Sequence, residues 1–250
     1  MPGDMRTSKM PTNRMDAIQI EYCFQVDDAQ DDRYLVTLDA ATLTTLSTPP
    51  PDLPAWTILR TNQCPNCPLD PRVEAHCPAA VNMVHLVKRF DQLLSYDKTL
   101  VSVTTEERRV FSHTTVQRGI CSLMGLLMAT SQCPRTAFFK PMARFHLPFA
   151  STQETIWRAT STYLLAQYFR YGDGCTPDMT FEGLSTIYGE IQIVNKAFAR
   201  RLRGACRQDS MVNAIILLDM FAKSMPTAIE ASLAEIRELF VPYLRSSERS

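Results

Sequence analysis

The residues of this chain that could do chemistry are its cysteines. Four of the eight cysteines are followed directly by proline, and three of these four lie in the stretch QCPNCPLDPRVEAHCPAA with the spacing C-x2-C-x9-C. The four are Cys64, Cys67, Cys77 and, further along the chain, Cys133. A short turn brings the two cysteines of a C-x2-C pair within reach of one ion, and thiolates suit zinc and iron–sulfur clusters. The pattern therefore predicts a metal centre with these four cysteines as ligands.

The prolines add a physical reason for this prediction. Proline is favoured at the first position of a helix, so Cys77-Pro78 and Cys133-Pro134 both fit a helix start. A sulfur at that place lies beside free backbone N–H groups and the positive end of the helix dipole. We expect this position to lower the thiol pKa and to help neutralise a four-thiolate site. His76 and His146 are reserve ligands.

Zinc and a [4Fe–4S] cluster are the two candidate cofactors. The CPNC turn resembles a zinc or rubredoxin-type knuckle, whereas repeated Cys-Pro is common in iron–sulfur domains. Zinc is favoured because it is abundant in structural sites. The alternative is a set of inert cysteines held in proline turns. The remaining cysteines, which have no partner spacing, are Cys23, Cys121, Cys175 and Cys206.

A second group of polar residues follows the fourth cysteine, in the segment PMARFHLPFASTQET. Arg144 and His146 lie close in sequence to Cys133 and could form a pocket that binds an anion or moves protons. The alternative is a loop between two helices, in which His146 bonds to backbone and Glu154 completes a helix cap with Ser151. A single histidine is a weak signal for acid–base chemistry. The segment therefore gives two hypotheses, an enzyme pocket and a structural connection.

Composition excludes several classes of function. The chain has 250 residues and a net charge of zero, so no basic field attracts nucleic acid or an anionic membrane. The apolar run 119–129 is too short to cross a bilayer. Residues 1–14 contain no apolar segment of a secretory signal, so we expect a cytoplasmic protein with reduced cysteines. Neither phosphate-loop motifs nor the G-x-S-x-G and H-E-x-x-H motifs of hydrolases occur.

Strands are predicted first along the chain and helices afterwards. Alternating apolar residues predict strands over 17–26 and 34–38, a short strand over 56–59, and a hairpin over 99–113. Helical spacing predicts a helix from Pro78 and further helices at 115–131, 151–169, 180–203, 210–223 and 227–245, the last two separated by Pro226. The fold class is therefore α+β, an N-terminal antiparallel sheet of about four to five strands followed by a bundle of about five helices.

These elements and the cysteines suggest how the chain is divided. We expect a disordered tail over residues 1–15, one α+β domain with the cysteine site over 16–225, and a C-terminal helix with a short tail over 226–250. The metal would tie the sheet to the helical part by closing a long loop.

Two helical segments suggest partners. In KAFARRLRGACR, five positive charges occur without an acid, and such a run is more often a solvated helix face than a nucleic-acid site. The apolar stripe of 227–245 is long enough to pack on the body of the protein or on a twin helix in a homodimer. The expected partners are otherwise an unidentified small molecule or protein, without nucleic acid or membrane.

The segments WTIL, NQCPNCPL and CPAA, followed by MATSQCP and PMARFHLPF, resemble a bacterial family of uncharacterised proteins, a domain of unknown function, over residues 17–222. The resemblance implies a cytoplasmic bacterial protein in which the Cys-Pro pieces form one signature, and it implies no activity. The sequence thus predicts a metal-binding module with a binding or regulatory role. An iron–sulfur redox or sensor protein and an enzyme that uses Arg144 and His146 are the alternatives.

Overall fold

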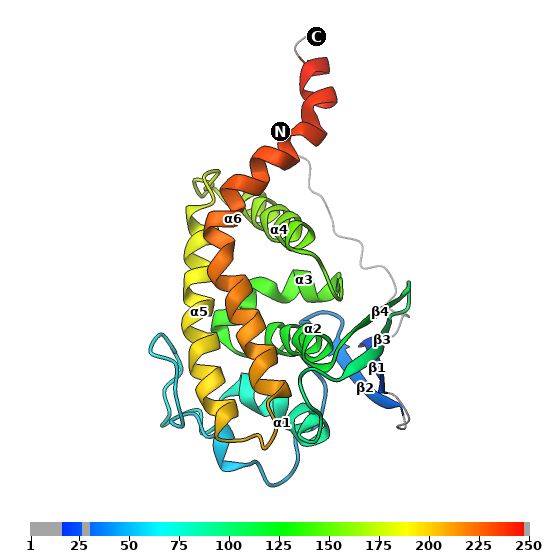
Figure 1. Cartoon of the computed structure of the whole chain (residues 1–250). Helices are drawn as coiled ribbons and strands as arrows, with labels where there is room; N and C mark the ends of the chain where they lie inside the picture. Colours follow the sequence, from blue (N-terminus) through cyan, green and yellow to red (C-terminus); the bar gives the residue numbers. More distant parts are fainter. Residues whose placement is uncertain (1–16, 27–30, 248–250) are drawn as a thin grey trace, which may run out of the picture.

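A computed structural model describes residues 17–26 and 31–247, so the tail expected at 1–15 lies outside the described residues. An antiparallel sheet with strand order β2-β1-β3-β4 lies beside a larger group of helices (Figure 1). Its strands are β1 (Ala17–Val26), β2 (Asp32–Asp39), β3 (Lys98–Thr104) and β4 (Arg109–Thr115). The helices are α1 (Pro78–Phe90), α2 (Val116–Ala129), α3 (Lys140–Arg144), α4 (Thr152–Gly172), α5 (Glu182–Arg203) and α6 (Ser210–Ser247), with 3-10 helices η1 (Ala55–Thr57) and η2 (Pro134–Phe139). The predicted α+β class is confirmed.

The sheet forms where the alternation predicted it. Ile20, Tyr22 and Phe24 of β1 are buried on one face, and β1 pairs with β2 on one side and with β3 on the other. Helix α2 approaches this face closely, because a side chain at Gly119 would bring its Cβ to 2.5 Å from a ring carbon of Phe24. The sheet and α2 thus share one densely packed interior.

The prediction of a short strand over 56–59 is wrong. Residues Ala55–Thr57 form η1, and beyond it Ile58 makes only an isolated bridge to His76. The backbone of Pro54 starts this turn, since its carbonyl accepts bonds from both the amide and the hydroxyl of Thr57, at 2.9 Å and 2.7 Å. The segment is therefore a turn that lies beside the cysteine loop.

Helix α6 is one continuous helix where two were expected, because Pro226 lies inside it. A proline has no N–H, so it leaves the carbonyl four residues earlier without its helical partner. That carbonyl belongs to Ala222, and Gln192 of α5 donates its side-chain amide to it at 3.3 Å. A side chain from the neighbouring helix thus replaces the bond that proline removes.

The described residues bury two hydrophobic clusters. The first joins the sheet with α1 and α2 and with parts of α5 and α6, and Cys64, Cys77 and Cys133 pack against it. The second joins α4 with other parts of α5 and α6, and it contains Ile156, Tyr163 and Tyr188. Helices α5 and α6 run side by side through both clusters (Figure 1).

One apolar stretch is longer than the run considered from sequence. Ser210–Ile229 of α6 has the length and composition of a membrane-spanning helix, with a mean hydropathy of 1.3, and 28% of it is buried inside the protein. Length and composition alone are a weak indication of a membrane span. Met211, Ala214 and Ile215 on this stretch belong to the first cluster and Met225 to the second.

Candidate metal centre

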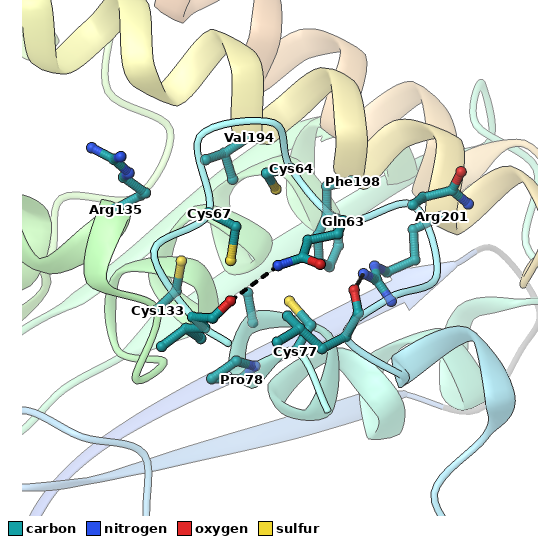
Figure 2. A pocket seen from close by; sticks show the side chains of 14 residues that line it. Gln63, Cys64, Cys67, Cys77, Pro78, Cys133, Arg135, Val194, Phe198 and Arg201 are labelled. Atoms are coloured by element: carbon teal, nitrogen blue, oxygen red, sulfur yellow. Dashed lines mark hydrogen bonds between the residues drawn. The ribbon is translucent and has the colours of Figure 1, made fainter. Parts of the chain in front are cut away.

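The four cysteines that precede proline line one cavity, although the fourth is far from the others in sequence. Cys64 and Cys67 come from the loop that precedes α1, Cys77 from the start of α1, and Cys133 from the start of η2. Figure 2 shows these side chains around a common space beneath α5, which contributes Val194 and Phe198. The structure therefore brings together all four predicted ligands.

Local structure explains how each cysteine reaches the cavity. The CPNC segment is a tight turn in which the amide of Cys67 donates to the carbonyl of Cys64 at 2.9 Å. Cys77 and Cys133 are the residues before α1 and η2, each with extended backbone and with proline at the first helical position. The amide of Cys77 also donates to the carbonyl of Thr57 at 2.8 Å, which joins the turn of η1 to the cavity.

The cysteine loop is held against α5 by polar contacts. Asn66, inside the CPNC turn, donates its side-chain amide to the backbone carbonyl of Glu190 at 3.0 Å and to its carboxylate at 2.5 Å. Arg135 donates to the carbonyl of Asn66 at 2.7 Å and forms an ion pair of 3.1 Å with the same carboxylate. These contacts connect the first two cysteines, the segment that carries Cys133, and α5.

Arg201 of α5 forms the other wall of the cavity and is only 2% exposed. Figure 2 shows its side chain beside Gln63 at the cavity. The guanidinium donates to the carbonyls of Trp56 and Ile58, and to that of Leu59 at 3.3 Å. Burial lowers the pKa of this guanidinium, while the nearby thiols of the cavity raise it. A guanidinium remains charged in proteins, so Arg201 supplies a positive charge next to the cysteines.

Burial also raises the pKa of two of the thiols. It raises the pKa of Cys64 to about 12, with smaller contributions in the same direction from the thiols of Cys77, Cys133 and Cys67. The pKa of Cys133 is raised as well, mainly by burial, although the backbone amides of Arg135 and Thr136 act in the opposite direction. The expectation that a helix start lowers the thiol pKa is therefore wrong for Cys133, because burial outweighs the backbone amides.

The donor set fits a metal in type, and the cavity fits one in size. Four thiols are the ligand set of structural zinc and of iron–sulfur centres. The cavity has a volume of about 20 Å³, which is space for about one water-sized particle. Among the residues that the structure describes, no group of three or more Cys, His, Asp or Glu side chains is placed so that it could hold a metal ion. The four thiols line one cavity, but their sulfurs are not gathered around a single point.

Arg144 and His146 lie apart from this cavity. The guanidinium of Arg144 is partly exposed and lies 3.7 Å from a carboxylate oxygen of Glu107. His146 is half-buried, and its Nε2 lies 2.6 Å from the hydroxyl of Tyr22, which also bonds to Ser122 at 2.9 Å. Burial lowers the pKa of His146 to about 3, so the ring is neutral at physiological pH. The other reserve ligand, His76, bonds through Nδ1 to the hydroxyl of Thr57 at 2.8 Å.

Sequence reasoning missed the charged residues that position the cysteines. Arg201 belongs to the basic run of α5, and the other basic residues of that run are exposed, as expected of a solvated face. A signal does exist, because Arg201 is flanked by buried residues at helical spacing, Val194, Phe198 and Leu202. Arg135 and Glu190 have no comparable sequence signal, since their contact depends on the tertiary fold.

A family model for a domain of unknown function, DUF6901, matches residues 20–241 of the chain. The match covers most of the sequence, so the protein belongs to this family, and the expected membership of an uncharacterised family is confirmed. No curated protein and no solved structure matches the chain.

Proposed function

We propose that the protein is a metal-binding module in which Cys64, Cys67, Cys77 and Cys133 hold one zinc ion. The observation that carries this proposal is that four thiols from three separate segments line a single cavity. The ion would join the loop before α1, the start of α1 and the start of η2, and so stabilise the junction between the sheet and the helices. The biological role would be binding or regulation, carried out by a fold that the metal completes.

Coordination chemistry favours zinc over a [4Fe–4S] cluster. Zinc accepts four thiolates in the tetrahedral arrangement that small ligand turns provide. The iron–sulfur alternative uses the same four cysteines, so the metal content of the protein decides between the two.

Charge compensation also supports a bound cation. Four thiolates around Zn²⁺ carry a net charge of about −2, and an uncompensated charge in a buried site is unfavourable. The guanidinium of Arg201 lies beside the cavity and is fixed by three backbone carbonyls, so it offsets part of this charge. When bound, zinc would hold the four sulfurs as thiolates, which overcomes the raised pKa of Cys64.

The state of the cysteines is compatible with a cytoplasmic location, which we also propose. All eight cysteines lie in the described part of the chain, and all are free thiols. Free thiols persist in reducing compartments, where cysteine clusters more often bind metals than form disulfides.

Metal content tests this proposal directly. Freshly purified protein is analysed for zinc and iron, together with the variants Cys67→Ser and Cys175→Ser. Cys175 is an exposed cysteine outside the cavity, so Cys175→Ser is the matched control. We expect about one zinc per chain in the wild type and the control, and a loss of at least about tenfold in zinc affinity for Cys67→Ser.

Two results would overturn the zinc assignment. A brown protein that contains iron and loses its absorbance near 400 nm in air would instead identify a cluster at the same cysteines. Protein that contains no metal after purification in zinc-supplemented medium, and whose melting temperature zinc does not change, would leave the four cysteines as packing residues.

A further inference from the structure

Helix α4 carries apolar side chains on both its inner and its outer face. Ile156, Ala159 and Tyr163 face inward and belong to the second cluster. The exposed residues on the rest of its surface include large apolar side chains: Trp157, Leu164, Leu165, Tyr168, Phe169 and Tyr171. Several large exposed apolar side chains on one helix are more typical of an interaction surface than of a solvated face. The outer face of α4, defined by these six residues, therefore has the composition of a covered surface.

No exposed charge interrupts the middle of this face. Between Glu154 and Arg170 the only charged residue is Arg158, and its guanidinium turns away to donate to the carbonyls of Met142 at 2.6 Å and Phe145 at 3.3 Å. Depletion of charge and enrichment in aromatic residues are typical of the centre of protein–protein interfaces. The face thus resembles an interface in its chemistry.

The area of the face matches one half of a dimer interface. Tyr168 is 68% exposed and Leu165 is 55% exposed. Since a fully buried aromatic side chain contributes about 150–250 Å², the six side chains together expose an area on the order of 700 Å². A standard interface buries about 800 Å² on each partner. The face is also larger than the apolar patch of about 300–600 Å² that a typical monomer exposes.

The apolar stripe of α6, which the sequence suggested for dimerisation, is largely used within the chain. Ile229 and Ile236 are buried in the second cluster, and Phe240 stacks on Trp157 of α4 with a centroid distance of 5.8 Å. The end of α6 instead extends beyond the other helices (Figure 1), and Leu239 and Tyr243 stay exposed there. Apolar surface is therefore exposed on α4, at the edge of the helical part, and at the end of α6.

We propose that the outer face of α4 packs against the same face of a second copy of this chain. A two-fold axis near the middle of the helix would place two α4 helices antiparallel, so that each face covers the other. Because the net charge of the chain is zero, two copies do not repel one another at neutral pH. This dimer does not depend on the cysteine site.

Sedimentation velocity of the full chain tests the dimer. The double variant Leu165→Glu/Tyr168→Glu places two charges at the centre of the face, on positions that are exposed in one copy. The control is Phe111→Glu, since Phe111 is a comparably exposed aromatic residue on β4, away from α4. We expect a wild-type dimer, an unchanged control, and a dissociation constant raised at least about 30-fold in the double variant.

Circular dichroism shows whether the double variant is folded, and Tyr168→Ser serves as a milder variant if it is not. A wild-type chain that remains monomeric at about 100 µM would overturn the proposal, because this concentration is near the dissociation constant of a weak homodimer. A folded double variant that still dimerises would also overturn it. A wild-type monomer that binds to phosphatidylcholine vesicles through this face would also overturn the proposal. It would show that the face of α4 is covered by lipid instead of by a second copy.

Discussion

The two hydrophobic clusters of this protein differ in how they are closed. The first is bounded by loops whose carbonyls accept hydrogen bonds from Arg201 of α5, and it borders the cysteine cavity. The second is built almost entirely from helices and leaves the outer face of α4 exposed. The comparison teaches that a cluster bordered by loops needs polar partners for its backbone groups, whereas a cluster of helices needs apolar surface to cover its exposed side chains. We propose an ion beside the first cluster and a second protein surface beside the second.

The largest effect is expected from removing the polar support of the first cluster. Arg201→Met keeps much of the apolar stem but leaves the carbonyls of Trp56 and Leu59 without their donor, while that of Ile58 keeps the amide of Thr61. Buried groups left unpaired cost about 1–3 kcal/mol each, so we expect the free energy of unfolding to fall by about 3 kcal/mol. Urea unfolding in the presence of zinc measures this change.

Arg200→Met is the matched control, because Arg200 is the preceding residue and is exposed. A surface substitution of this kind changes stability by less than about 0.5 kcal/mol. Equal losses in the two variants would mean that α5 needs the charge of its basic run in general, and that the first cluster is not closed by Arg201.

The second prediction concerns His146, which lies in the segment between α3 and α4 and bonds to Tyr22 of β1. In the folded protein its pKa is lowered to about 3 from the usual 6.5, mainly by burial. Between these two pH values the unfolded chain binds more protons than the folded chain, so stability falls as the pH is lowered from about 6.5 towards 3. At pH 5 the contribution lost is about 2 kcal/mol relative to pH 8.

Urea unfolding at both pH values, for the wild type and for His146→Gln, checks this effect. Glutamine does not titrate, so the variant should lose about 2 kcal/mol less than the wild type on acidification. His85→Gln is the control, since His85 lies on the exposed side of α1 and bonds only to the carbonyl of Thr48. Identical pH profiles for the wild type and His146→Gln would show that His146 is charged in the folded state.

Most of the fold could be predicted from residue periodicity. The alternation of Ile20, Tyr22 and Phe24 and the capping box of Ser151 and Glu154 each produce the element expected, because short-range patterns determine local structure. The turn and helix-start geometry of the cysteines could be predicted for the same reason, whereas the approach of Cys133 to the other three depends on the tertiary fold.

What could not be predicted depends on contacts between distant segments. Arg201 bonds to carbonyls more than 140 positions earlier in the chain, and a charge run in sequence gives no sign of such a partner. Likewise a proline such as Pro226 normally ends a helix, and the bond from Gln192 to the carbonyl that it frees comes from another helix. Local rules fail at these positions because a side chain from another element satisfies the backbone.

The smallest effect is expected at this proline, inside the helical half of the molecule. Gln192→Ala removes the donor to the carbonyl of Ala222 and should cost about 1 kcal/mol, the usual contribution of one hydrogen bond. In a Pro226→Ala background the new backbone N–H can donate to that same carbonyl, so the loss caused by Gln192→Ala should be much smaller. Urea unfolding of the two single variants and the double variant measures this coupling. If the losses in the free energy of unfolding were additive, Gln192 would contribute through packing. Helix α6 would then tolerate Pro226 without a hydrogen bond from α5.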